Sequence, residues 1–261
     1  MKKYYILMMT LLLPLFAFTG CSKDKSTQNT DVQDEAFTEA RTDADSAVIE
    51  FTEDNEESGD WLLGEGGSPI FGDSVDFDTS GFWHVFIRER SDGLLTFSVA
   101  DSFRFTDING NYQMRRDSTT NELERRLKKR FEKAAPPDTP GTSWTKIRNR
   151  NMMWVGLADS ITTLNGDVYR YYHGQFERRS FSREFDGEFI DARFYTADIF
   201  DGRPTHPYEG TLVGTITVDR SRPNGNLHIE AQLTVTFYPD HYHAALQSGN
   251  SYREWDHYYR P

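Results

Sequence analysis

Two histidines near the C-terminus, His241 and His243, have the type and spacing of a metal-binding pair. Side chains two residues apart on a β-strand point to the same face, so both imidazoles could reach one ion. Two ligands do not complete a site, and a third would have to come from elsewhere, for example from His228 or His206. The alternative is a pair of exposed polar residues near a strand end, because this spacing is common.

A second candidate cation site lies in the stretch DFDTSG, where Asp76, Asp78 and Ser80 alternate ahead of a glycine. This spacing resembles the start of an EF-hand calcium loop. The position that should supply the bidentate glutamate is Ile87, however, and a strand pattern follows where a helix is expected. An acidic turn before a strand accounts for the same residues equally well.

The middle of the chain is basic, with only five acidic residues within 115–150. In a cytosolic protein such a stretch would suggest nucleic acid. Behind a secretion signal, the better candidates are anionic glycans, lipid head groups or the chain's own acidic segment, and the alternative is a solvated helix face. The basic residues are Arg115, Arg116, Arg125, Arg126, Lys128, Lys129, Arg130, Lys133, Lys146, Arg148 and Arg150.

Common catalytic motifs are missing from the sequence. It contains no Gly-x-Ser-x-Gly, no His-Glu-x-x-His, no phosphate-binding loop and no Cys–His pair. Paired carboxylates of a glycoside hydrolase would escape such a search, because their separation is a property of the fold. We therefore expect no cofactor and no nucleic-acid partner, and we favour a non-enzymatic protein.

The single cysteine, Cys21, follows a segment with the layout of a secretion signal. A basic start precedes an apolar run over 6–18, which is shorter than the roughly 20 residues that span a bilayer. The sequence Phe-Thr-Gly-Cys at 18–21 resembles the lipobox of bacterial lipoproteins, with Phe18 in place of the usual leucine. The resemblance implies that Cys21 becomes the acylated N-terminus and, with Ser22 next, that the outer membrane is the favoured location. The alternative is an unpaired thiol, a liability in an oxidising compartment.

Composition divides the chain into three parts: a signal peptide over 1–20, an acidic tether over 21–60 and a β-rich domain over 61–261. Residues 31–60 hold twelve acidic side chains and one basic side chain, a net charge of −11. Such a composition favours a solvated linker. A short helix near 34–51 is the alternative within it, since Phe37, Ala40, Ala44 and Val48 recur near helical spacing.

The domain over 61–261 reads as antiparallel β-structure. Every second residue from Leu227 to Phe237 is apolar, as in a strand with one buried face, and we expect it to pair with 210–218. Dipeptides that favour tight turns recur at 92–93, 109–110, 165–166, 186–187, 201–202 and 224–225. The predicted fold class is mainly β, an antiparallel meander of hairpins that forms a sandwich or an open barrel.

One short helix is predicted near 120–134. Thr119 and Glu122 have the spacing of a capping box, and Leu123, Leu127 and Phe131 recur every four residues before two prolines.

These patterns leave three functional hypotheses for a lipid-anchored protein of the cell envelope. The first is a structural or binding module, the second a lipocalin-like carrier of a lipophilic ligand, and the third a hydrolase of envelope glycans. A deep apolar pocket would favour the carrier, and a filled body would favour the module.

Overall fold

The computed structural model describes several helical residues between 34 and 49 (34, 37–42, 44–46, 48 and 49), together with 76–136, 141–177, 179–200, 206–223 and 225–259. Cys21 and the turn dipeptide at 201–202 lie outside these residues.

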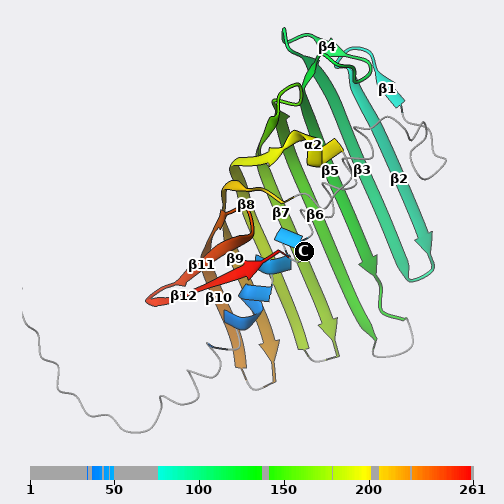
Figure 1. Ribbon diagram of the computed structural model, residues 1–261. Helices are drawn as coiled ribbons and strands as arrows, with labels where there is room; N and C mark the ends of the chain where they lie inside the picture. The colour runs from blue at the N-terminus through cyan, green and yellow to red at the C-terminus, as the bar shows by residue number, and fades with distance from the viewer. Residues whose placement is uncertain are drawn as a thin grey trace, which may run out of the picture.

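One continuous antiparallel sheet of twelve strands forms the body (Figure 1). Neighbours in the chain are neighbours in the sheet, except that short β4 pairs only with β3, so that β3 also pairs with β5. The sheet is not closed, and β1 and β12 form its two edges. The strands are β1 (Asp76–Asp78), β2 (Trp83–Asp92), β3 (Leu95–Asp107), β4 (Tyr112–Gln113), β5 (Thr120–Lys133), β6 (Thr142–Val155), β7 (Ile161–Phe176), β8 (Arg179–Tyr195), β9 (Glu209–Arg222), β10 (Gly225–Phe237), β11 (His241–Ser248) and β12 (Ser251–Tyr258), and helix α2 (Thr196–Phe200) follows β8.

The alternation of side chains gives the sheet two different faces. Leu233, Val218 and Phe185 are buried together with other alternate residues of β6–β12 in one large core. A smaller cluster of Phe86, Val99 and Leu127 continues the same face across β2, β3 and β5. We call this side the inner face and the opposite side the outer face.

The N-terminal helix, the helical residues described between 34 and 49, packs on the inner face (Figure 1). Phe37, Ala40, Ala44 and Val48 are at most 7% exposed and belong to the large core. The helical alternative is thus confirmed for these four residues, and the favoured solvated linker is wrong for them. This part of the acidic segment 21–60 belongs to the core of the sheet.

The mainly β, antiparallel meander is confirmed, and it takes the form of one open sheet. The predicted pairing of the 227–237 strand is also confirmed, because β10 pairs with β9 along its length.

The predicted helix near 120–134 is wrong, because Thr120–Lys133 forms β5 between β3 and β6. A spacing of four is an even number, so Leu123, Leu127 and Phe131 share one face of a strand as well as of a helix. Thr119 does not cap a helix. Its N–H and its hydroxyl both donate to Asp117, at 2.7 and 2.6 Å, in the turn before β5.

Two of the predicted turns, at 165–166 and 186–187, lie inside β7 and β8. Gly166 has a φ of 149°, and a Cβ there would collide with the backbone carbonyl oxygen of Asn151 on β6. A glycine at 166 therefore allows β6 and β7 to approach closely. The dipeptide at 109–110 lies in the turn after β3, whereas Asp92 is the last residue of β2 and only Gly93 lies in the turn that follows.

Candidate binding site on the inner face of the sheet

Basic side chains gather on the inner face. Residues paired directly across neighbouring strands share a face, and Arg150 of β6 pairs with the inner residue Leu127 of β5. Lys146 and Arg148, at alternate positions of β6, therefore lie on the inner face as well. On β7 and β8 the same rule adds Arg170 and Arg183. Among the side chains that the structure describes in β2–β9, the set is Arg88, Arg90, Arg125, Lys129, Lys133, Lys146, Arg148, Arg150, Arg170, Arg179, Arg183 and Arg220, which we call the cationic face. Most of these side chains also have an interaction partner in the chain.

The acidic side chains described in β5–β9 lie on the outer face. Among the described residues of β5–β9, no carboxylate occupies an inner position. Asp167 on β7, Glu184 and Asp186 on β8 and Asp219 on β9 all lie on the outer face. The sheet therefore separates charge across its thickness, and its inner face attracts anions.

One inner carboxylate, Asp101 of β3, is neutralised locally. It accepts hydrogen bonds from Arg125 of β5 at 3.0 Å from Nε and 2.6 Å from NH2, and both side chains are at most 7% exposed. This bidentate pair lies beside the small cluster that contains Leu127, so it is a structural element of the core.

Aromatic rings alternate with the cations along the inner face. Phe97 and Phe131 pack with their ring centroids 4.7 Å apart on β3 and β5. On β7 and β8, Phe181 packs against Tyr172 at 5.1 Å and stacks on Phe176 at 5.7 Å. Guanidinium groups beside aromatic rings suit ligands that combine negative charge with apolar surface.

A hollow of about 530 Å³ opens where β7, β8 and β9 reach their hairpin ends. Phe176, Arg179, Phe181, Arg183 and Arg220 line it, together with Ser180 and Ser221. The rings form its apolar wall, and the guanidinium group of Arg183 lies 5.7 Å from the Phe181 ring centroid. We call this feature the Arg-Phe hollow.

The N-terminal helix reaches the edge of the Arg-Phe hollow through Glu39. The Glu39 carboxylate forms an ion pair with Arg220 and lies 3.9 Å from NH2 of Arg183. Glu39 is only 14% exposed in its side chain, so this contact also fixes the helix to β8 and β9. An anion is thus already held between two of the three arginines of the hollow.

The cations predicted in 115–150 do not form one patch. Lys129, Lys133, Lys146, Arg148 and Arg150 belong to the cationic face, whereas Arg126, Lys128 and Arg130 point outward from the same strand β5. Arg126 stacks on Trp83, and Arg130 pairs with Glu132. Residues outside this stretch, among them Arg170, Arg179, Arg183 and Arg220, complete the cationic face. The signal that could have found them is the alternation of arginines with other residues along strands, which places them on one face.

His241 and His243 share the outer face of β11, as expected from their spacing. Each imidazole has its own carboxylate: Nδ1 of His241 lies 2.7 Å from Asp240, and Nδ1 of His243 lies 2.8 Å from Asp256. The His243 Nε2 atom is 3.9 Å from Glu254. The part of the chain that the structure describes contains no group of three or more His, Cys, Asp or Glu side chains arranged to hold a metal ion.

Asp76, Asp78 and Ser80 surround the turn between β1 and β2. Oδ1 of Asp78 accepts from the Ser80 N–H at 2.9 Å and from its hydroxyl at 2.7 Å, and these bonds lower the pKa of Asp78. The hydrogen bonds close a local turn, and Asp76 pairs with Val85 as the edge of the sheet. The geometry accounts for these residues as turn formers.

The described helices include none that is long and apolar enough to cross a membrane. No family model, curated protein or solved structure matches the chain.

Proposed function

We propose that the chain is a cell-envelope lipoprotein, anchored through an acylated Cys21 and favoured at the outer membrane, that acts as a non-enzymatic binding module for anionic lipid. The observation that supports the binding role is the cationic face, where arginines and lysines alternate with phenylalanines and the described residues of β5–β9 contribute no inner carboxylate. The lipobox resemblance supports the anchor.

Lipid suits this surface better than a glycan or a fully enclosed apolar ligand. Anionic lipids present a phosphate directly beside hydrocarbon, which matches cations beside Phe97, Phe131 and Phe181. A carrier would enclose its ligand, whereas the helix fills the inner side over β8–β12 and the Arg-Phe hollow is open and lined by arginines. The geometry therefore favours the module over the carrier.

Vesicle sedimentation tests the binding role. The mature chain with Cys21→Ser should bind phosphatidylglycerol vesicles and not phosphatidylcholine vesicles. A cation near an anionic membrane contributes about 1 kcal/mol, so Lys133→Glu on the inner face should weaken binding by about fivefold or more. Lys128→Glu, on the outer face of the same strand, is the matched control.

The effect should shrink in high salt, because the Debye length falls from about 10 Å at 0.1 M to about 3 Å at 1 M. Equal losses for the two lysine variants, or equal binding to both kinds of vesicle, would reject the assignment of binding to the inner face. Tight binding to heparin with none to vesicles would point to a glycan instead.

Cell fractionation tests the anchor separately. Cys21→Ala should accumulate as an unprocessed precursor or appear in the soluble fraction, since it has no thiol to acylate. Processed Cys21→Ala that still sediments with carbonate-washed membranes would contradict the anchor.

A further inference from the structure

The Arg-Phe hollow differs from the rest of the cationic face in its shape. Elsewhere the cations form rows on a sheet, but here Arg179, Arg183 and Arg220 converge with two phenylalanines around one open volume of about 530 Å³. Phe176 is 40% exposed, a substantial area of aromatic surface for a ring at a strand end.

Arg179 is the solvent-exposed cation of this hollow. Glu39 offsets part of the charge of Arg183 and Arg220, and the described residues that line the hollow include no carboxylate. A guanidinium presents a planar fork of donors that fits two oxygens of a phosphate. The hollow therefore combines a phosphate-binding group with an apolar wall.

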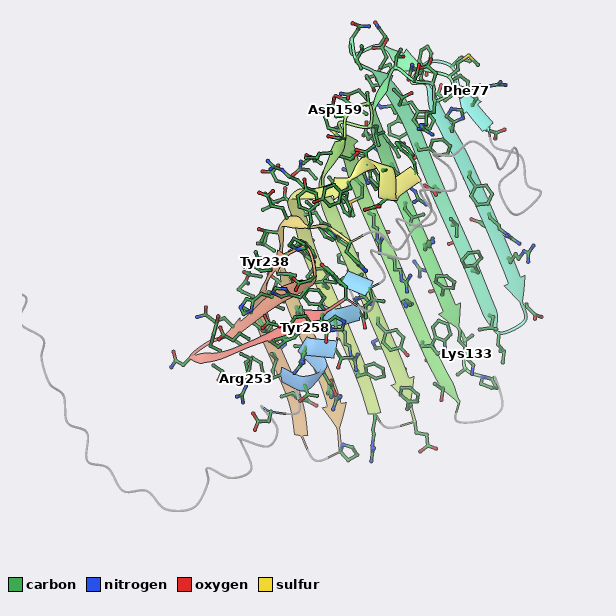
Figure 2. The ribbon with its side chains drawn as sticks, in the orientation of Figure 1. Phe77, Lys133, Asp159, Tyr238, Arg253 and Tyr258 are labelled. Atoms are coloured by element: carbon green, nitrogen blue, oxygen red, sulfur yellow. The ribbon has the colours of Figure 1, made fainter. Side chains whose placement is uncertain are left out.

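The N-terminal helix places the hollow close to the anchoring end of the chain. Glu39 forms ion pairs with both Arg183 and Arg220, and Asp34, one turn and a half earlier, pairs with Arg253 at 2.6 Å. Figure 2 labels Arg253. From Cys21 to Asp34 is thirteen residues, which span at most about 45 Å when fully extended. An acylated Cys21 would thus hold the hollow no farther from the bilayer than about the length of this segment.

We propose that the Arg-Phe hollow is a head-group site for an anionic phospholipid of the membrane that carries the anchor. Arg179 binds the phosphate, with Arg183 and Arg220 adding positive potential, and Phe176 and Phe181 pack against the first apolar carbons. This inference rests on the proposed function and narrows its ligand to a phospholipid and its site to one end of β7–β9.

The experiment compares two arginines of the inner face with the same charge change. Arg179→Gln removes the exposed guanidinium of the hollow, and Arg90→Gln removes an exposed one on distant β2. Binding of the mature Cys21→Ser chain to phosphatidylglycerol vesicles should weaken about thirtyfold for Arg179→Gln, the loss of one charge-assisted contact, and only about fivefold for Arg90→Gln, the loss of one cation near an anionic surface. Arg179→Lys should recover only part of the loss, because an ammonium lacks the planar fork.

A second variant separates the lipid from free phosphate. Phe176→Ser should weaken binding to vesicles and leave any binding of glycerol phosphate unchanged, because glycerol phosphate has no acyl chain to contact the ring. Circular dichroism melting of each variant establishes that the sheet is intact.

Equal losses for Arg179→Gln and Arg90→Gln would overturn the hollow and leave the cationic face as a diffuse lipid-binding surface. Full binding by Phe176→Ser would overturn the apolar wall and leave a site for phosphate alone. Failure of the parent chain to bind phosphatidylglycerol at all would instead reject the proposed function.

Discussion

The hydroxyl group of Tyr242 donates a hydrogen bond of 2.6 Å to Oδ1 of Asp45, although the two residues are 197 positions apart. The indole N–H of Trp255 donates to the same oxygen at 3.0 Å. Burial raises the pKa of Tyr242, and the bond to Asp45 raises it further. One carboxylate of the helix is therefore held by β11 and β12.

Replacing Asp45 should detach this end of the helix. Asp45→Ala leaves the buried Tyr242 hydroxyl without its acceptor, and we expect the free energy of unfolding in urea to fall by about 2 kcal/mol. Thr42→Ala, at an exposed position of the same helix, should change it by less than about 0.5 kcal/mol. In a double-mutant cycle, Asp45→Ala with Tyr242→Phe should lose less than the sum of the single variants, and strict additivity would argue against the bond.

For the buried pair of Asp101 and Arg125, removing one partner should cost more stability than removing both. Asp101→Ala leaves a cation that is 7% exposed beside the small cluster, which should cost about 3–5 kcal/mol. Asp101→Leu combined with Arg125→Met should recover most of that loss, because it removes both charges together. Chemical denaturation measures both, and a double variant as unstable as Asp101→Ala would mean that the pair contributes more than local neutralisation.

Leu233 and Thr234 test the two faces of β10. Leu233 is 1% exposed in the core, whereas Thr234 is exposed on the outer face. Leu233→Asp would bury an unpaired charge and should unfold the protein, while Thr234→Asp should be mild. Melting curves compare the two, and equal melting temperatures would contradict the register of the strand.

Stability should fall as the pH drops below about 6.5, the ordinary histidine pKa. Burial, with a contribution from His257, lowers the pKa of His206, and burial also lowers that of His84. As the pH falls, the unfolded chain therefore binds protons at these histidines before the folded chain does. The stability that comes from keeping the two imidazoles neutral is present above about pH 6.5, and it is lost as the pH falls toward their lower folded-state pKa values.

The variant His206→Phe isolates this effect. It retains a ring to stack on Tyr259, where the centroids are 3.9 Å apart, and it cannot be protonated. Between pH 7 and pH 5.5 the melting temperature of the parent protein should fall more than that of the variant. Parallel curves would show that His206 does not contribute to the pH dependence.

Local pattern was sufficient for the elements whose periodicity has one interpretation. Alternation from Leu227 to Phe237 predicts a strand because no helical stripe fits it, and the spacing of Phe37, Ala40, Ala44 and Val48 fits a helix alone. The spacing of Leu123, Leu127 and Phe131 fits both. There the pairing with β3 and β6 decided for a strand, since its hydrogen bonds come from residues far along the chain.

The sequence by itself determined the β-rich class, the antiparallel order and the resemblance of residues 18–21 to a lipobox, because each depends on residues close together in the chain. It indicated the amphipathic helix only as the alternative to a solvated linker. Only the tertiary structure decided that the N-terminal helix packs on the inner face of the sheet. It also decided that Arg179, Arg183 and Arg220 converge with Phe176 and Phe181. Those relationships depend on which strands become neighbours and on their register. A shift of one residue would move every arginine of a strand to the other face.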